Sequence, residues 1–390
     1  MKGFKIVVGC MAYILLSCTG TKTDLSENKV CNINVDVKDY CNEIGETGAI
    51  YFENCRYVQL ETDTNSMIGE VTKLILTKDR IYILDMFKAK SVFIFDSNGA
   101  YINKIFRFGQ GAEEYLQLTD IFYNEKEETI NLSDIRGKIM SFDKDGHMVK
   151  KQIKFPLRIF NMEQDKNGNY ILNSKNTSSP SFPESINVFS PAQEKIYSAF
   201  PIQPEWESKV VKSNSDFSYF AGDIFYTPQL TTDVYKLGLD SVSQVYHYNF
   251  GEHTFPDEYK TPEYFLPSNK KDLMNYVKQL DNFCETKKYL FALFVLKGQK
   301  YMNIYDKIKE SSKTHHLSGN PIDFGGFGEI ISFTENSIVT IQDPNYYLGR
   351  FDDKELLAER GPEIQKLKDK FTRPLKEDDN PILCIYKIKD

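Results

Sequence analysis

A short segment with the pattern of a β-strand recurs in this chain at a nearly constant spacing. Phe95, Phe142 and Phe189 each lie near the end of such a segment, 47 residues apart from one to the next, and Tyr235 follows 46 residues later. A period of this length, carried by short alternating strands, is typical of the blades of a β-propeller. One four-stranded blade cannot bury its own faces, so the repeat predicts blades that pack radially around a central channel.

Each repeat contains four strand-like segments. In the first repeat these are 71–77, 81–85, 91–96 and 101–106, and the glycine of Ser97-Asn98-Gly99 supplies the positive φ of a tight hairpin. The same order of segments predicts further repeats over 117–154, 158–200, 217–250, 283–317 and 324–388.

The spacing fails after Tyr235, because the next match, Tyr305, follows only after 70 residues. The excess lies at about 251–280, where three prolines argue against a hidden seventh blade and the amphipathic stretch 270–280 predicts a short helix. A charged, helix-prone excursion over 354–370 interrupts the sixth repeat.

The two ends of the chain are expected to close the ring. Segment 55–60 has the pattern of a strand but no blade of its own, and the sixth repeat, whose last strand is 382–388, is one strand short. Pairing of the two ends would remove exposed sheet edges. The predicted fold class is therefore all-β, a six-bladed β-propeller closed by pairing of N-terminal and C-terminal strands.

The N-terminus has the features of an export signal. Lys2 and Lys5 precede an apolar stretch, 6–16, that is too short to span a bilayer and runs into Ser17-Cys18. This order resembles a bacterial lipoprotein signal, which implies that Cys18 becomes the N-terminus and that its thiol carries a diacylglyceryl anchor. An ordinary cleaved signal with an incidental cysteine is the alternative. The expected organisation is a signal peptide over 1–17, a tether and N-terminal segment over 18–50, and a propeller over 51–390 with a partly helical insertion at about 251–280.

The composition agrees with an exported, β-rich protein. Aromatic residues make up 14% of the chain, with 24 Tyr and 28 Phe, which suits strand packing. The formal net charge of −7 gives no support for nucleic-acid binding, and no second apolar run is long enough to cross a membrane. Cys55 and Cys384 lie in strand-like runs and are expected as buried, inert thiols, whereas the sequence does not decide whether Cys31 and Cys41 form a disulfide.

Several short sequence segments together resemble those of a known family. They are Tyr57-Val58-Gln59-Leu60-Glu61-Thr62 before Ile68-Gly69-Glu70, Ile81-Tyr82-Ile83-Leu84-Asp85 before Val92-Phe93-Ile94-Phe95-Asp96, Gly109-Gln110-Gly111-Ala112-Glu113-Glu114-Tyr115, and Asn380-Pro381-Ile382-Leu383. With the lipoprotein signal, they resemble the six-bladed β-propeller lipoproteins of Bacteroides-like bacteria, which are related to NHL-repeat propellers. The chain departs from the family at Ala112-Glu113, where Pro-Gly is usual. The resemblance implies the fold and a lipid-anchored place in the cell envelope, expected at the outer membrane and facing the periplasm or the surface. It implies no established activity.

Propeller geometry indicates where a binding site would lie. The loops between second and third strands emerge on the same face as the connections between blades, and this loop-rich face collects the segments 85–90, 107–115, 134–138 and 174–185. We expect a site there, near the channel mouth, formed by Arg107, Gln110, Glu114, Tyr115, Asp134 and Arg136. Aromatic residues on this face would suit stacking on a sugar, namely Phe87, Tyr115 and Phe182. The alternative is that Gly109-Gln110-Gly111 forms a tight turn between blades and that these charges are merely solvated.

Catalytic and metal-binding patterns are weak. The five histidines lack a metal-ligand spacing, and Asp143-Lys144-Asp145-Gly146 lacks the other ligands of a calcium loop and is better interpreted as a hairpin. We therefore expect no catalytic residue, no metal and no cofactor.

Two functional classes remain. The favoured class is a lipid-anchored binding or scaffold module for a glycan, a peptide or a partner protein of the envelope. The alternative is an enzyme, a metal-dependent lyase or lactonase-like hydrolase with its site in the central channel. That chemistry needs carboxylates or histidines that point inward from different blades. The repeats do not indicate such residues at equivalent inner positions, which is why binding is ranked above catalysis.

Overall fold

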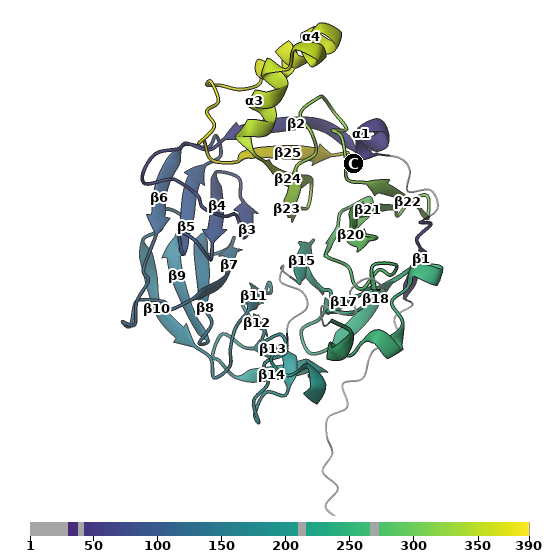
Figure 1. Cartoon of the computed structure of the whole chain (residues 1–390). Helices are drawn as coiled ribbons and strands as arrows, with labels where there is room; N and C mark the ends of the chain where they lie inside the picture. The colour runs from purple at the N-terminus through teal and green to yellow at the C-terminus, as the bar shows by residue number, and fades with distance from the viewer. Residues whose placement is uncertain (1–29, 38–42, 210–215, 266–272, 390) are drawn as a thin grey trace, which may run out of the picture.

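The structure is a computed structural model that describes residues 30–37, 43–209, 216–265 and 273–389. Its strands form six small sheets that stand in a ring around a central channel (Figure 1). The predicted six-bladed β-propeller is confirmed. We number the blades 1 to 6 in the chain order of their innermost strands.

In blades 1 to 5, consecutive strands run from the channel to the rim. Blade 1 contains β3 (Lys73–Leu76), β4 (Arg80–Asp85), β5 (Ser91–Asp96) and β6 (Tyr101–Ile105). Blade 2 contains β7 (Leu118–Asn124), β8 (Thr129–Asp134), β9 (Lys138–Asp143) and β10 (Met148–Lys154). Blade 3 contains β11 (Asn161–Gln164), β12 (Tyr170–Asn173), β13 (Glu184–Phe189) and β14 (Lys195–Pro201). Blade 4 contains β15 (Phe217–Phe220), β16 (Asp223–Tyr226), β17 (Asp233–Leu237) and β18 (Val242–Asn249), and blade 5 contains β19 (Asn282–Glu285), β20 (Tyr289–Leu296), β21 (Gln299–Asp306) and β22 (Ser311–His316).

Blade 6 joins the two ends of the chain, as predicted. Its inner strands are β23 (Glu329–Thr334) and β24 (Ser337–Gln342), followed by β25 (Ile382–Ile388) and, at the rim, β2 (Phe52–Gln59). The antiparallel register of β2 and β25 runs from Phe52 opposite Ile388 to Gln59 opposite Ile382. Because the N-terminal strand is held on the last blade, the ring cannot open without breaking this ladder.

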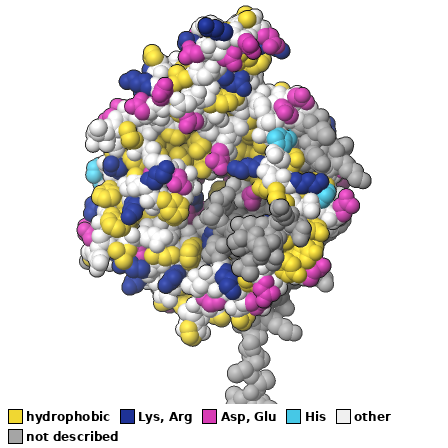
Figure 2. All heavy atoms as spheres, in the orientation of Figure 1, with side chains coloured by type: hydrophobic (Ala, Val, Ile, Leu, Met, Phe, Trp, Pro, Cys, Tyr) yellow, Lys and Arg dark blue, Asp and Glu magenta, His cyan; other side chains and the backbone are white. Residues whose placement is uncertain are grey.

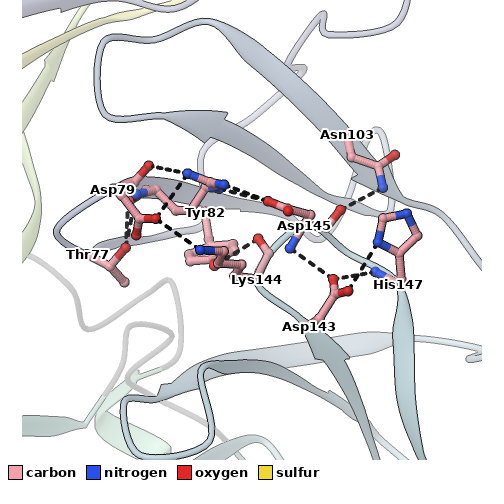
Figure 3. A network of polar contacts seen from close by, with 9 residues as sticks. Thr77, Asp79, Tyr82, Asn103, Asp143, Lys144, Asp145 and His147 are labelled. Atoms are coloured by element: carbon pink, nitrogen blue, oxygen red, sulfur yellow. Dashed lines mark hydrogen bonds and ion pairs between the residues drawn. The ribbon is translucent and has the colours of Figure 1, made fainter.

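The core lies between neighbouring blades. In the cluster between blades 1 and 2, fully buried side chains such as Leu84, Ile94 and Leu132 come from both sheets. Each sheet thus buries both of its faces, which explains why the central strands are near-continuous apolar runs. On the face with the short turns, Figure 3 shows a polar network that joins the same two blades: Arg80 binds Asp145 at 2.8 Å, and Lys144 reaches Asp79 at 3.5 Å.

The hairpin of blade 2 explains the sequence Asp143-Lys144-Asp145-Gly146. One carboxylate oxygen of Asp143 accepts hydrogen bonds from the backbone N–H groups of Asp145 and His147, both at 2.9 Å. Gly146 has φ +88°, which a residue with a Cβ rarely adopts. The interpretation as a hairpin rather than a calcium loop is therefore confirmed.

The described part of the N-terminal segment packs against the ring. Strand β1 (Cys31–Asn34) joins blade 4 as a fifth strand, parallel to β18, and buries Ile33 and Val35. The chain then contacts blade 5 and forms α1 (Ile44–Thr47) and η1 (Gly48–Ile50) before entering blade 6. The described residues of the predicted tether and N-terminal segment, 30–37 and 43–50, therefore pack against the ring through buried apolar side chains.

Several insertions lie on the loop-rich face. Helix α3 (Pro344–Asp352) and helix α4 (Lys354–Lys368) form the excursion between β24 and β25 and project from blade 6 in Figure 1. Between blades 3 and 4 lies η2 (Pro204–Trp206), and the insertion after β18 contains η3 (Gly251–His253), η4 (Asp257–Tyr259) and η5 (Pro262–Phe265). The predicted helix over 270–280 begins outside the described residues, and from 274 to 280 the chain forms turns and an isolated bridge.

The predicted signal peptide, the lipidation site Cys18 and Cys41 lie outside the described residues. Within the described part of the chain, no helix is long and apolar enough to cross a membrane. Cys55 and Cys384 are buried as free thiols, as predicted.

Candidate functional site

The loop between blades 1 and 2 holds four of the six residues that the sequence predicts as a binding site. Tyr115 is completely buried there; its hydroxyl donates to the carbonyl of Lys90 at 2.6 Å and accepts from the backbone N–H of Arg107 at 3.0 Å. Burial raises the pKa of the Tyr115 phenol to about 12. Tyr115 therefore fixes the loop and presents no ring for a sugar, and Phe182, which is also buried, does not present one either.

Asp134 and Arg136 form a pair at the end of β8. Nε and Nη2 of Arg136 donate hydrogen bonds to Oδ1 and Oδ2 of Asp134, both at 3.0 Å. Oδ2 of Asp134 also accepts a hydrogen bond from the backbone N–H of Leu116 at 2.6 Å. Burial opposes ionisation of Asp134, but these hydrogen bonds outweigh it and lower the pKa of the carboxyl. Asp134 thus anchors the connection between blades 1 and 2, while half-exposed Arg136 closes over it.

The remaining predicted residues lie on the same loop. Glu114 accepts a hydrogen bond from the N–H of Gly111 at 2.7 Å, and Gln110 is exposed. The ammonium group of Lys138 donates to three carbonyls of this loop, including that of Glu114. The structure therefore brings the six residues together, but most of their polar groups are engaged in holding the loop. A cavity of about 270 Å³ beside it is lined mainly by apolar groups, including exposed Phe87 and Phe108.

A larger cavity, of about 410 Å³, lies between blades 3 and 4 on the loop-rich face. We call it the blade 3–4 pocket. Its walls come from the loop after β12, the end of β14, η2, the residue before β15 and the loop after β16, and Lys260 of the insertion completes it. A volume above about 300 Å³ with mixed apolar and polar walls is typical of sites for small ligands.

Charged groups lie deep in this pocket. Asp216, only 6% exposed, accepts a hydrogen bond from the side-chain amide of Asn173 at 2.9 Å. The ammonium group of Lys175 lies 4.0 Å from the same carboxylate oxygen, and the backbone N–H of Lys175 is fixed by Asn173 at 2.7 Å. Burying such side chains is costly unless polar partners compensate their lost hydration, so this hydrogen-bonded cluster gives the pocket a polar wall.

Aromatic residues also line the pocket. Trp206, the single tryptophan of the chain, donates its indole N–H to the carbonyl of Lys260 at 3.2 Å. Phe200 packs on Tyr226 with ring centroids 4.9 Å apart and is held at φ +63°. Burial raises the pKa of the Tyr226 phenol, so the ring carries a neutral hydroxyl at physiological pH. The sequence predicts the loop 174–185 on this face, but it does not single out Lys175, Trp206, Asp216 or Tyr226 as site residues.

The central channel holds a second cluster of charges, contributed by the first strands of blades 1, 2 and 3. Lys73 reaches Asp120 at 2.8 Å and Glu163 at 3.7 Å. Asp120 is buried and also accepts from the N–H of Met162 on the next blade at 2.9 Å. Burial in the channel raises the pKa of Glu163 to about 7; Lys73 opposes this change and Asp120 reinforces it.

Asp120 and Glu163 bring carboxylates into the channel from blades 2 and 3, but Glu163 follows Asp120 by 43 residues rather than by the repeat spacing of 47. The repeat in the sequence therefore does not reveal this cluster. The first strands are short and carry one such charge each, which is too weak a signal to stand out from surface charges. Across the described part of the chain, no group of three or more His, Cys, Asp or Glu side chains is placed to hold a metal ion.

The fold and its cavities define the class of protein: a six-bladed β-propeller with a polar pocket on its loop-rich face. The chain belongs to the family described as "Domain of unknown function (DUF4934)", whose sequence model matches residues 33–387. The match covers the whole ring, which confirms the predicted membership of a propeller family. No curated protein matches the chain.

Solved structures share the fold. A presumed exported protein from Bacteroides fragilis has a TM-score of 0.72 at 18% identity, over 93% of this chain and 100% of that one. A protein of unknown function from Bacteroides caccae gives a TM-score of 0.39 at 10% identity, over 61% of this chain and 78% of that one. BamB from Moraxella catarrhalis gives 0.42 at 8% identity, over 73% and 72%. The last two similarities are too low to carry an argument.

Proposed function

We propose that this protein is a lipid-anchored binding module of the cell envelope and that it binds a short glycan in the blade 3–4 pocket. The observation that carries the proposal is the pocket itself, where buried Asp216 and Lys175 share the walls of a cavity of about 410 Å³ with the aromatic residues Trp206, Phe200 and Tyr226. The export part is supported by the signal-like N-terminus and by the name of the Bacteroides fragilis relative in fold.

The chemistry of the walls favours a sugar. Sugars carry many hydroxyl groups and are bound by polar groups that fix their orientation, beside apolar walls. Here Trp206, 8% exposed, and Tyr226, 4% exposed, form part of such a wall rather than an open stacking face. The pocket supplies hydroxyl-binding groups from Asn176, Gln203 and Gln229 next to its charged pair. Because Asp216 and Lys175 make this wall of the pocket polar, a ligand with polar groups suits it better than a purely apolar one.

The single tryptophan makes the proposal directly testable. Because Trp206 lines the pocket, its fluorescence reports on occupancy without any label. We expect one class in a panel of envelope oligosaccharides to change the Trp206 emission saturably, and the change to be lost in Asp216→Asn and in Lys175→Met. Lys90→Met, beside the smaller cavity, is the matched control and should bind normally. Saturable binding that survives both pocket substitutions would contradict the proposal.

The anchor has its own test. In the intact organism or a bacterial host, we expect mass spectrometry of the purified chain to find a lipid on Cys18 and the Cys18→Ala variant to leave the membrane fraction. A Cys18→Ala chain that stays with membranes after carbonate and salt washing would show that lipidation is not what holds the protein there.

One observation favours a second function, catalysis in the channel. A carboxyl with a pKa near the working pH is suited to general acid–base chemistry, and Glu163, with its pKa of about 7 beside Lys73, fits that description. Turnover of an oligosaccharide by the native chain, lost in Glu163→Gln while Trp206 still reports binding, would support this alternative.

A further inference from the structure

The tight turn between β21 and β22 presents the most exposed large apolar side chain of the described residues. Ile308, at its tip, is 76% exposed. One carboxylate oxygen of Asp306 accepts hydrogen bonds from the N–H groups of Ile308 and Lys309, both at 3.0 Å, so the turn is held in shape. Nothing in the core requires Ile308, and an isoleucine held out into water by a fixed turn suggests a partner that is itself apolar.

Basic residues surround Ile308. The neighbouring turn after β19 carries exposed Lys287, and the N–H of Lys307 donates to the carbonyl of Lys288 at 2.9 Å, which joins the two turns into one surface. Exposed Lys309 and Lys313 flank the tip, whereas Glu310 is the exposed acid in the turn. Lys307 is paired with Glu285 at 2.9 Å, and the ammonium group of Lys309 lies 3.8 Å from the carboxylate of Asp306. We call Lys287, Ile308, Lys309 and Lys313 the blade 5 patch.

The described chain begins beside this patch. Cys31, the first residue of β1, contacts Tyr305, three residues before Ile308, and Ser312 on the other side of the turn donates to the carbonyl of Asn34 at 3.1 Å. The twelve residues 19–30 separate Cys31 from the proposed lipid on Cys18. A chain of that length spans at most about 45 Å and on average about 20 Å when flexible. A lipid on Cys18 would therefore keep this rim of the ring close to the bilayer.

We infer that the blade 5 patch is a second membrane contact, with Ile308 entering the headgroup region and the lysines binding anionic phospholipid. This inference rests on the proposed anchor at Cys18. A basic patch adds to the affinity that a lipid anchor supplies, and each lysine near an anionic surface contributes about a fivefold gain in affinity. The orientation that follows directs the rim of blades 4 and 5 toward the lipid.

The test uses the full, lipidated chain on vesicles of phosphatidylethanolamine and phosphatidylglycerol that carry a headgroup nitroxide. A fluorophore is attached at Ile308→Cys or, as a control, at Leu357→Cys on α4, in a background of Cys31→Ser and Cys41→Ser. We expect strong quenching at position 308 and little at 357. Lys287→Glu with Lys309→Glu should remove most of the quenching at 308, whereas Lys354→Glu with Lys366→Glu, an equal charge change on α4, should not.

The outcomes separate this inference from the anchor. Equal quenching at 308 and 357 on a chain that floats with the vesicles would overturn the patch and leave the anchor standing. Quenching at 308 that persists after the charge reversal, or on vesicles of phosphatidylcholine alone, would overturn the role of anionic lipid. A chain that carries no lipid on Cys18 and does not float would instead refute the anchor.

Discussion

At the scale of single residues, acidic side chains at different positions of the ring differ in how readily they ionise. Asp134 is an acidic group whose pKa is lowered because hydrogen bonds to Arg136 and Leu116 outweigh its burial, so it stays ionised and structural. Glu163 is an acidic group whose pKa is raised to about 7, so its charge changes near neutrality. Sequence alone could not distinguish the two, since the difference comes from the partners that the fold supplies.

Glu163 makes stability depend on pH. Its folded pKa of about 7 lies above the unfolded value, so the folded chain binds more protons and stability falls as the pH rises from about 4.5 to 7. Glu163→Gln removes this loss, and we expect it to stabilise the protein at pH 8 by up to about 3 kcal/mol, with little effect at pH 4. Chemical denaturation at both pH values measures this change in the free energy of unfolding. An equal effect of Glu163→Gln at both pH values would contradict a raised pKa of Glu163.

Asp134 has the opposite dependence. Because its folded pKa is lowered, the stability it contributes is present above its unfolded pKa and is lost as the pH falls through the folded pKa. Asp134→Ala leaves the N–H of Leu116 without its acceptor and should cost about 3 kcal/mol near neutral pH. Arg136→Ala, at the more exposed end of the pair, is the matched comparison and should cost less than Asp134→Ala. If thermal unfolding shows that Arg136→Ala loses more stability than Asp134→Ala, the conclusion that Asp134 is the more important member of the pair is wrong.

At the scale of elements, the strands of the blades could be predicted from the sequence, whereas strand β1 and helix α3 could not. The alternation of apolar residues and the hairpin glycines locate the strands of blades 1 and 2 to within a few residues, and the pairing of 55–60 with 382–388 appears as β2 with β25. Strand β1 was missed because four residues with alternating burial are too short a pattern to count as a strand. Helix α3 was missed as well, since only the charged stretch that became α4 has a helical signature.

Strand β1 gives a prediction at this scale. Ile33 is 1% exposed and packs between blades 4 and 5, so Ile33→Ala should leave a cavity and cost about 3 kcal/mol. Asn32→Ala, on the exposed side of the same strand, should cost far less. Equal urea midpoints for the two variants would show that β1 does not contribute to the stability of the ring.

At the scale of the whole molecule, the repeat fixes the ring and the two faces, and the irregular parts make the pocket. The loops between second and third strands and the connections between blades were expected on one face, and the blade 3–4 pocket is built from such segments. Its residues could not be chosen in advance, because Lys175 lies in the loop after β12 while Trp206 and Asp216 lie in the connection from β14 to β15, with no shared motif. The predicted residues around Tyr115 lie on the same face, and their binding role stays a prediction.

Calorimetric titration with the oligosaccharide selected by Trp206 fluorescence compares the blade 3–4 pocket with the connection between blades 1 and 2 most directly. The account predicts that Asp216→Asn weakens binding at least tenfold and that Arg136→Ala leaves the dissociation constant unchanged, with both variants folded by circular dichroism. Binding that is lost in Arg136→Ala and retained in Asp216→Asn would place the site at the connection of blades 1 and 2 and contradict the blade 3–4 pocket.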